Sequence, residues 1–400
     1  MNATIRPLGA ALAASLFAAP LALADSSSLT EALKDSETRL HLRTRFEDVD
    51  QDGVEGSSAL TQKTRLTYSS GSYEGFSLLL EMDDTTALTD VDYNDGTGIN
   101  TGTAVIADPE GTEINQAYLA YQAGDTALKY GRQRILLDNQ RFVGGVGWRQ
   151  NEQTYDGFSA KSTALEDLEL FYAYVHNVNR IFGESVAGGD HKHQSHLLNG
   201  AFTGLNAGKL VGYAYLLDNE SAPGLSSDTL GLRWEGKLSD ALSYNLEYAT
   251  QSEAGDNPTE YSASYLMAEG LASVQGFKLK VGYEVLGSDD GNAAFTTPLA
   301  TLHAFQGWTD KFLATPATGV EDFYVSAGRA VGPVNLALVH HTLSANEGDS
   351  DYGSELGLVA GTKVGPVGLT FKYADYSADD DSEGWATDTR KIWLMVAATF

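Results

Sequence analysis

Four arginines and three acidic residues lie close together in residues 130–156. They are Arg132, Arg134, Arg141, Arg149, Asp138, Glu152 and Asp156. Guanidinium groups bind carboxylates and other anions through paired hydrogen bonds. An exposed loop does not need four arginines, whereas a loop folded into an interior can pair some of them and offer others to an anion. The stretch therefore predicts an inward-folded segment, and both roles, anchoring the loop and binding an anionic solute, remain open.

Other basic residues alternate with apolar ones. In residues 38–48, apolar and basic side chains take opposite faces of a candidate strand, and the next candidate strand places two basic residues on one face. A lysine or arginine facing lipid at mid-depth costs roughly 2–4 kcal/mol, so these side chains are expected to face water. The predicted lining residues of a water-filled lumen are Arg39, Arg43, Arg45, Lys63, Arg65, Arg132, Arg134, Arg141 and Arg149.

The elements that would position these residues are strands with period-2 alternation. Residues 392–400 and 277–285 place apolar side chains at every second position, which is typical of a strand with one apolar face. Similar segments are expected at 38–48, 59–70, 74–83, 113–123, 126–136, 154–163, 167–177, 193–204, 208–218, 227–237, 240–251, 259–270, 274–286, 320–330, 333–345, 352–363, 366–377 and 388–400.

The connections between these segments alternate between short and long. Gly124-Asp125, Gly332 and Gly365 lie in short ones, whereas 84–112 and 287–319 are long. Short periplasmic turns and long extracellular loops produce this pattern in outer-membrane barrels. The chain is therefore predicted to be all-β, a transmembrane antiparallel barrel of about 18 strands. A sheet of that size leaves an interior too wide for side chains alone, so an inward-folded loop is expected to form the constriction.

The N-terminal segment has the features of a secretory signal. Arg6 precedes an apolar run over 8–23, and Ala22-Leu23-Ala24 matches a cleavage pattern. We expect residues 1–24 to be a signal peptide and residues 25–400 to form one barrel domain. A membrane anchor is the less favoured alternative, because the apolar run is short and contains a proline.

Composition excludes several classes of protein. The net charge is −28, which disfavours nucleic-acid binding. There is no cysteine, so thiolate metal sites and disulfides are excluded. Asp48, Asp50 and Asp52 resemble the start of a calcium loop, but the flanking helices and the closing glutamate are missing. A rim that binds calcium or bridges lipopolysaccharide is the functional interpretation of these acidic loops, and a solvated acidic surface is the default.

Two other classes of function are alternatives to transport. An outer-membrane enzyme would need an activated nucleophile, but the chain has no Gly-x-Ser-x-Gly motif. His191, His193 and His196 lie in a loop as a weak metal motif, and His340 and His341 point to opposite faces of a strand. We therefore expect no enzyme. A structural or adhesive barrel is the other alternative, and it predicts a blocked lumen.

Two segments resemble one known family. Residues 131–156, from Gly-Arg-Gln-Arg to Gln-Thr-Tyr-Asp, and residues 297–312, from Thr-Pro-Leu-Ala to Thr-Asp-Lys-Phe, are similar to the alginate-export-type outer-membrane porins. The resemblance implies a monomeric 18-stranded barrel with an arginine-rich lumen, to which Arg132, Arg134, Arg141 and Arg149 would contribute. It also implies that Phe400 contacts the barrel-assembly machinery.

The expected function is passage of small hydrophilic, anionic solutes across the outer membrane. Export of an anionic polysaccharide such as alginate is the alternative. No separate export-specific periplasmic element can be recognised in the chain, which favours uptake. Lipid and lipopolysaccharide are the expected surroundings, and no cofactor is expected apart from the calcium considered above.

Overall fold

Eighteen strands form a closed antiparallel barrel in the computed structural model, which describes residues 25–400 except 90–91, 381 and 383–386. The predicted signal peptide, 1–24, lies outside the described residues. The barrel strands are β2 (Glu37–Gln51), β3 (Ser57–Ser69), β5 (Phe76–Ala87), β6 (Gly111–Ala123), β7 (Thr126–Gln133), β8 (Thr154–Leu165), β9 (Leu168–Asn179), β10 (Asp190–Leu205), β11 (Gly208–Leu217), β12 (Ser227–Ser239), β13 (Leu242–Glu253), β14 (Ser262–Val274), β15 (Phe277–Leu286), β18 (Val320–Val331), β19 (Val334–Ser344), β20 (Asp351–Val364), β21 (Val367–Ala378) and β22 (Thr389–Thr399).

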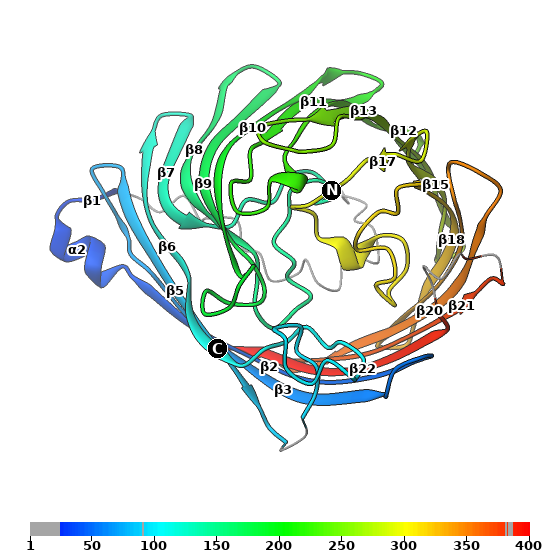
Figure 1. The fold of residues 1–400 in the computed structure, drawn as a ribbon. Helices are drawn as coiled ribbons and strands as arrows, with labels where there is room; N and C mark the ends of the chain where they lie inside the picture. The colour runs from blue at the N-terminus through cyan, green and yellow to red at the C-terminus, as the bar shows by residue number, and fades with distance from the viewer. Residues whose placement is uncertain (1–24, 90–91, 381, 383–386) are drawn as a thin grey trace.

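The first and last barrel strands close the ring. β2 pairs with β22 from His41–Thr399 to Gln51–Thr389, and Figure 1 looks into the resulting ring. Closure is required because an unpaired strand edge cannot be satisfied in hydrocarbon. The predicted fold class and strand number are therefore confirmed.

The alternation of side chains explains why these segments form the wall. In β12, Leu230 and Leu232 are 57% and 58% exposed, whereas Thr229 before them and Arg233 after them are buried. The exposed leucines face outward, and the buried polar residues face the interior. This arrangement is the reverse of a water-soluble sheet and suits a wall surrounded by lipid.

Turns at one end of the barrel are tight, and those at the other end are long. Gly124, Gly332 and Gly365 have φ of 57°, 58° and 60°, a conformation that favours glycine. The longest connections are residues 88–110, 134–153 and 287–319. The predicted alternation of short and long connections is thus confirmed.

A few small elements complete the described chain. α2 (Leu29–Lys34), capped by Ser28, lies beside the short parallel pair β1 (Asp25–Ser26) and β4 (Ser72–Tyr73), outside the ring in Figure 1. β16 (Ser288–Asp289), β17 (Ala293–Ala294) and η3 (Leu302–Ala304) lie within the longest connection, and η2 (Pro223–Leu225) precedes β12. None of the helices in the described part of the chain is long and apolar enough to cross a membrane.

One wall strand ends earlier than expected. The sequence predicts a strand over 126–136, but β7 ends at Gln133 and has 8 residues. The chain then turns into the barrel, where long connections fill the interior (Figure 1). Phe142 from this inward segment packs against Tyr265 and Phe295 with ring centroids 5.2 and 5.8 Å apart. In this inward segment, contacts between aromatic rings take the place of the hydrogen bonds that a longer strand would make with its neighbours.

Candidate functional site

Two inward segments meet inside the barrel. Residues 134–153 and 287–319 are joined by a bridge between Val143 and Leu299, and the Gly144 amide donates to the Leu299 carbonyl at 2.8 Å. These are the two stretches that carry the family resemblance. They are more than a hundred residues apart in sequence, and backbone pairing makes them one structure across the lumen.

The wall supports this junction from one side. The hydroxyl of Tyr155, fully buried at the start of β8, donates to the Gly144 carbonyl at 2.7 Å. Gln153 Nε2 donates to the carbonyls of Gly144 and Leu299, each at 3.1 Å. Buried carbonyl oxygens thus keep their partners where the chain is neither helix nor strand.

Arg141 ties both inward segments to the wall. Its Nε donates to Glu284 of β15 at 2.6 Å, and its two terminal nitrogens donate to Thr297 Oγ1 at 3.0 Å and Gln306 Oε1 at 3.1 Å. Tyr265 donates to the same carboxylate at 2.6 Å. By these contacts, Arg141 anchors the inward segments to the wall.

Arg149 makes a second anchor. It contacts Glu47 of β2 at 3.0 Å and Asp310 of the other inward segment at 3.1 Å. Lys391 of β22 reaches Asp310 at 2.9 Å. Burial opposes ionisation of Asp310, but neighbouring His303, Lys391 and Arg149 hold the pKa of this carboxyl well below its usual range.

Arg45 and Arg43 lie on the inward face of β2. Arg45 is fully buried and is paired with Asp108. Arg43 donates instead to Gln150 Oε1 at 2.8 Å and to the carbonyls of Gly147 at 2.9 Å and Arg149. All three acceptors are neutral, and no carboxylate among the described residues lies within salt-bridge distance of Arg43. Its direct partners are therefore dipoles, and the carboxylates of Asp108 and Glu152 act on its charge from beyond salt-bridge distance.

Three cations and three carboxylates form a compact group that we call the Glu152 cluster. Glu152 lies within 3.4 Å of Lys63, 2.8 Å of Arg65 and 2.5 Å of Arg134. The members are Lys63, Arg65, Arg134, Glu81, Asp83 and Glu152. Because opposite charges occur in equal number, the cluster is neutral as a unit.

Seven of the nine predicted cations thus lie in the interior. Arg39 lies on the same face of β2 as Arg43 but near the end of the strand, and Arg132 lies on the other face of the wall. Arg39 is 45% exposed in its side chain and pairs with Glu37 near the end of β2. Arg132 pairs in register with Asp156, next to the outward pair of Tyr130 and Phe158. The register therefore places Arg132 on the outward face of the wall.

A buried lysine with an aromatic surround is a site that the sequence pattern does not reveal. Lys372 Nζ of β21 lies 4.3 Å from the ring centroid of Trp148, 3.9 Å from Trp308 and 5.4 Å from Trp393. It also lies 2.7 Å from His303 Nε2. We call these residues the Lys372 cage. The lysine's inward position was predictable, but no spacing signal brings the three tryptophans together.

His303 connects the cage to Asp310. Its ring stacks on Trp148 at 4.5 Å, and its Nδ1 lies 2.7 Å from Asp310 Oδ1. Burial lowers the pKa of His303 to about 3, and the Lys372 charge acts in the same direction. The ring is therefore neutral near pH 7, so that Nε2 accepts from Lys372 and Nδ1 donates to Asp310.

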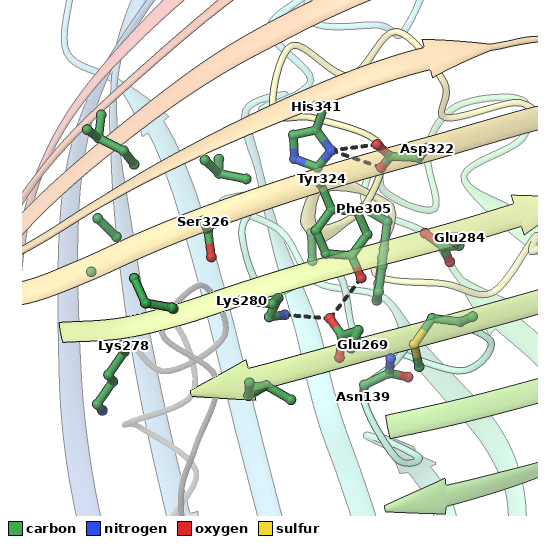
Figure 2. A pocket seen from close by; sticks show the side chains of 18 of the residues that line it. Asn139, Glu269, Lys278, Lys280, Glu284, Phe305, Asp322, Tyr324, Ser326 and His341 are labelled. Carbon is green, nitrogen blue, oxygen red and sulfur yellow. Dashed lines mark hydrogen bonds and ion pairs between the residues drawn. The ribbon is translucent and has the colours of Figure 1, made fainter. Parts of the chain in front are cut away.

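A pocket of about 160 Å³ lies against the wall formed by β14, β15, β18 and β19 (Figure 2). Lys280 Nζ and the Tyr324 hydroxyl both donate to Glu269, at 2.6 and 2.8 Å. His341 contacts Asp322 at 2.9 Å, and Phe305 of the inward segment covers the pocket. The pocket thus presents aromatic faces together with charges that are already paired.

The weak metal candidates do not gather into a site. Asp50 pairs with Arg390 at 2.6 Å. Within the described part of the chain, no group of three or more His, Cys, Asp or Glu residues is placed to hold a metal ion. Calcium binding by Asp48, Asp50 and Asp52 stays a prediction.

Solved structures with the same architecture are outer-membrane channels. Acinetobacter baumannii OccAB2 superposes with a TM-score of 0.71 at 18% identity, covering 92% of this chain and 98% of that one. Pseudomonas aeruginosa OpdK, solved with vanillate, gives 0.70 at 15%, covering 92% and 99%. P. aeruginosa OccK8 (OprE) gives 0.69 at 16%, with the same coverage as OpdK. At these identities the similarity shows the fold.

The sequence comparison supplies the family. No curated protein matches the sequence. The model of the family described as alginate export matches residues 38–285, which is more than half of the chain and includes the arginine-rich segment. The chain therefore belongs to the alginate export family and is an outer-membrane β-barrel of the porin type.

Proposed function

We propose that this porin passes small hydrophilic solutes through its lumen with a preference for anions. The observation that carries the proposal is the charge balance along the inward face of β2. Arg43 has neutral acceptors only, and the nearby Lys372 is surrounded by indoles and a neutral imidazole. A local excess of positive charge in a low-dielectric setting attracts anions.

The pairing of the two inward segments supports small solutes over a polymer. Residues 134–153 and 287–319 are joined to each other inside the barrel. A polysaccharide in transit would require these segments to separate, which would break the Arg141 and Arg149 anchors. Small carboxylates are the solute class we favour, and the vanillate in the OpdK structure is an aromatic example from a protein of the same fold.

Ion selectivity of the refolded barrel in planar bilayers tests the proposal. Under a salt gradient, the wild-type reversal potential should indicate anion preference, and Arg43→Gln should move it toward cation preference. Arg39→Gln is the matched control, because Arg39 is half exposed and paired with Glu37. A cation-selective wild type, or equal shifts for both variants, would refute the anion preference.

Polymer export is the second candidate, since the family is described by it. Export predicts that oligomeric uronates block the current at concentrations where small carboxylates do not. The proposed uptake role predicts the reverse order of block.

A further inference from the structure

The wall of the barrel is incomplete beside β6. β7 pairs with β6 only from Ala117–Arg132 to Ala123–Thr126, whereas β6 continues to Gly111, still paired with β5 on its other side. A strand needs about 9–11 residues to cross the bilayer, and β7 has 8. The outer half of β6 therefore extends beyond its neighbour.

A side chain takes the place of the missing strand. Arg132 NH1 donates to the Ile114 carbonyl at 2.9 Å, and Arg132 Nε contacts Asp156 at 2.9 Å. Backbone carbonyls at membrane depth require a partner. The guanidinium thus connects β6 to β8 across the gap.

The loop between β9 and β10 covers the same gap. Glu184 pairs with Arg132, and its amide donates to Glu113 Oε1 at 2.8 Å. The other oxygen of Glu113 accepts from Asn151 Nδ2 of the inward segment at 3.1 Å. The Glu113 side chain therefore links this surface loop to a segment inside the lumen.

A cavity of about 770 Å³ occupies the gap, and residues of both faces of the wall line it. Asp83 and Asn151 belong to the lumen side. Ile114 and Tyr130 belong to the outward side, where they are 49% and 67% exposed. A cavity with lining from both faces crosses the wall.

The outward mouth of the cavity lies at the edge of the apolar belt. Met82 is exposed and pairs with Ile114, whereas the next outward pair, Asp84 and Thr112, is polar and joined by a hydrogen bond. The mouth therefore faces the boundary between acyl chains and headgroups of the outer leaflet. Its apolar rim suits the tail of an amphiphile, and its carboxylates, amide and guanidinium suit a polar head.

We propose that this cavity is a lateral port, in which an amphiphile of the outer leaflet places its acyl chain between β6 and β8, with the Arg132–Glu184 pair as a latch. The Glu184 side chain is 47% exposed, and the loop that carries it is not a wall strand, so it is the part of the closure that can move. The inference concerns the wall and does not rest on the solute preference proposed for the lumen.

Quenching by brominated lipids tests the port in the full-length barrel. Because the chain has no cysteine, Asn151→Cys introduces a unique label site on the lumen side of the cavity. Ser326→Cys, in the lumen pocket on the opposite wall region, is the matched control. Lipids brominated on their acyl chains should quench the label at 151 more strongly than the label at 326.

The latch is tested in the same labelled protein. Glu184→Gln removes the ion pair but leaves Arg132 paired with Asp156, so the barrel should still fold. The fraction of barrels with an open port should rise roughly two- to fivefold, as expected for loss of a partly exposed ion pair. Quenching of the label at residue 151 should rise with it. Ile114→Trp should fill the mouth of the cavity and lower the quenching at residue 151. Equal quenching at 151 and 326 in all variants would overturn the port, and quenching at 151 that ignores Glu184→Gln would overturn the latch.

Discussion

The Glu152 cluster and the Lys372 cage bury positive charge in the same lumen by different means. In the cluster, three cations face three carboxylates. In the cage, one lysine faces three indole rings and a neutral imidazole. In the cluster, removing one charged residue leaves its partners buried without their opposite charge. In the cage, the aromatic faces stabilise the lysine without an opposite charge, so removing the lysine leaves no unpaired charge in contact with it. The two regions should therefore respond differently to the loss of one residue.

The largest effect is expected from Glu152→Gln. The change leaves Lys63, Arg65 and Arg134 with two carboxylates, and removing one partner of buried ion pairs costs about 3–5 kcal/mol. The free energy of unfolding of the refolded barrel in urea measures it. Glu169→Gln is the control, because its pair with Lys161 is half exposed and contributes at most about 1 kcal/mol. Equal effects of the two changes would show that the cluster is not coupled.

A pH effect should follow from His303 in the cage. Its folded-state pKa is about 3, below the value near 6.5 of an unfolded chain. The unfolded state therefore binds the extra proton first, and stability falls as the pH falls from 6.5 toward 3. The loss from this residue should be about 2 kcal/mol at pH 5. His303→Gln should remove that part of the pH dependence of unfolding, and an unchanged slope would contradict a neutral buried ring.

Lys372→Met should cost less than the change in the cluster. Methionine has a similar length and can pack against the tryptophans, and no carboxylate in direct contact loses its only partner. We expect a destabilisation of about 1–2 kcal/mol, the size of a desolvated cation–π contact. Urea unfolding of Lys372→Met and of Glu152→Gln, measured under the same conditions, decides the comparison. A loss as large as that of Glu152→Gln would mean that the lysine charge is essential to the carboxylates around it.

The smallest effect is expected at the outer rim. Arg390 and Asp50 are about half exposed or more, so Arg390→Gln should change the unfolding free energy by less than about 0.5 kcal/mol. High salt should abolish even that difference, because exposed charges are screened. A larger or salt-insensitive change would indicate that the rim is more ordered than a solvated surface.

Much of the wall could be predicted from local patterns. β12, β15 and β22 lie where alternation placed them, because a period of two depends only on neighbouring residues and on the cost of facing lipid. β7 is the exception. Its alternation is irregular, Gly131 has a φ of 124°, and the chain leaves the wall three residues before the predicted end. Arg132 and Arg134 consequently lie on opposite sides of the wall, although their spacing placed them on one face.

The sequence by itself determined the barrel, its strand number, its orientation of polar and apolar faces, and the inward placement of the arginine-rich segment beyond Arg132. These properties follow from the free energy of each side chain in water or lipid, which is a local quantity. Only the tertiary structure decided which charges neutralise one another, how the two family segments pair, and where the Lys372 cage forms. Several of those contacts join residues more than a hundred positions apart, such as Arg149 with Glu47 and Lys372 with Trp148, and barrel closure and loop packing set their distances.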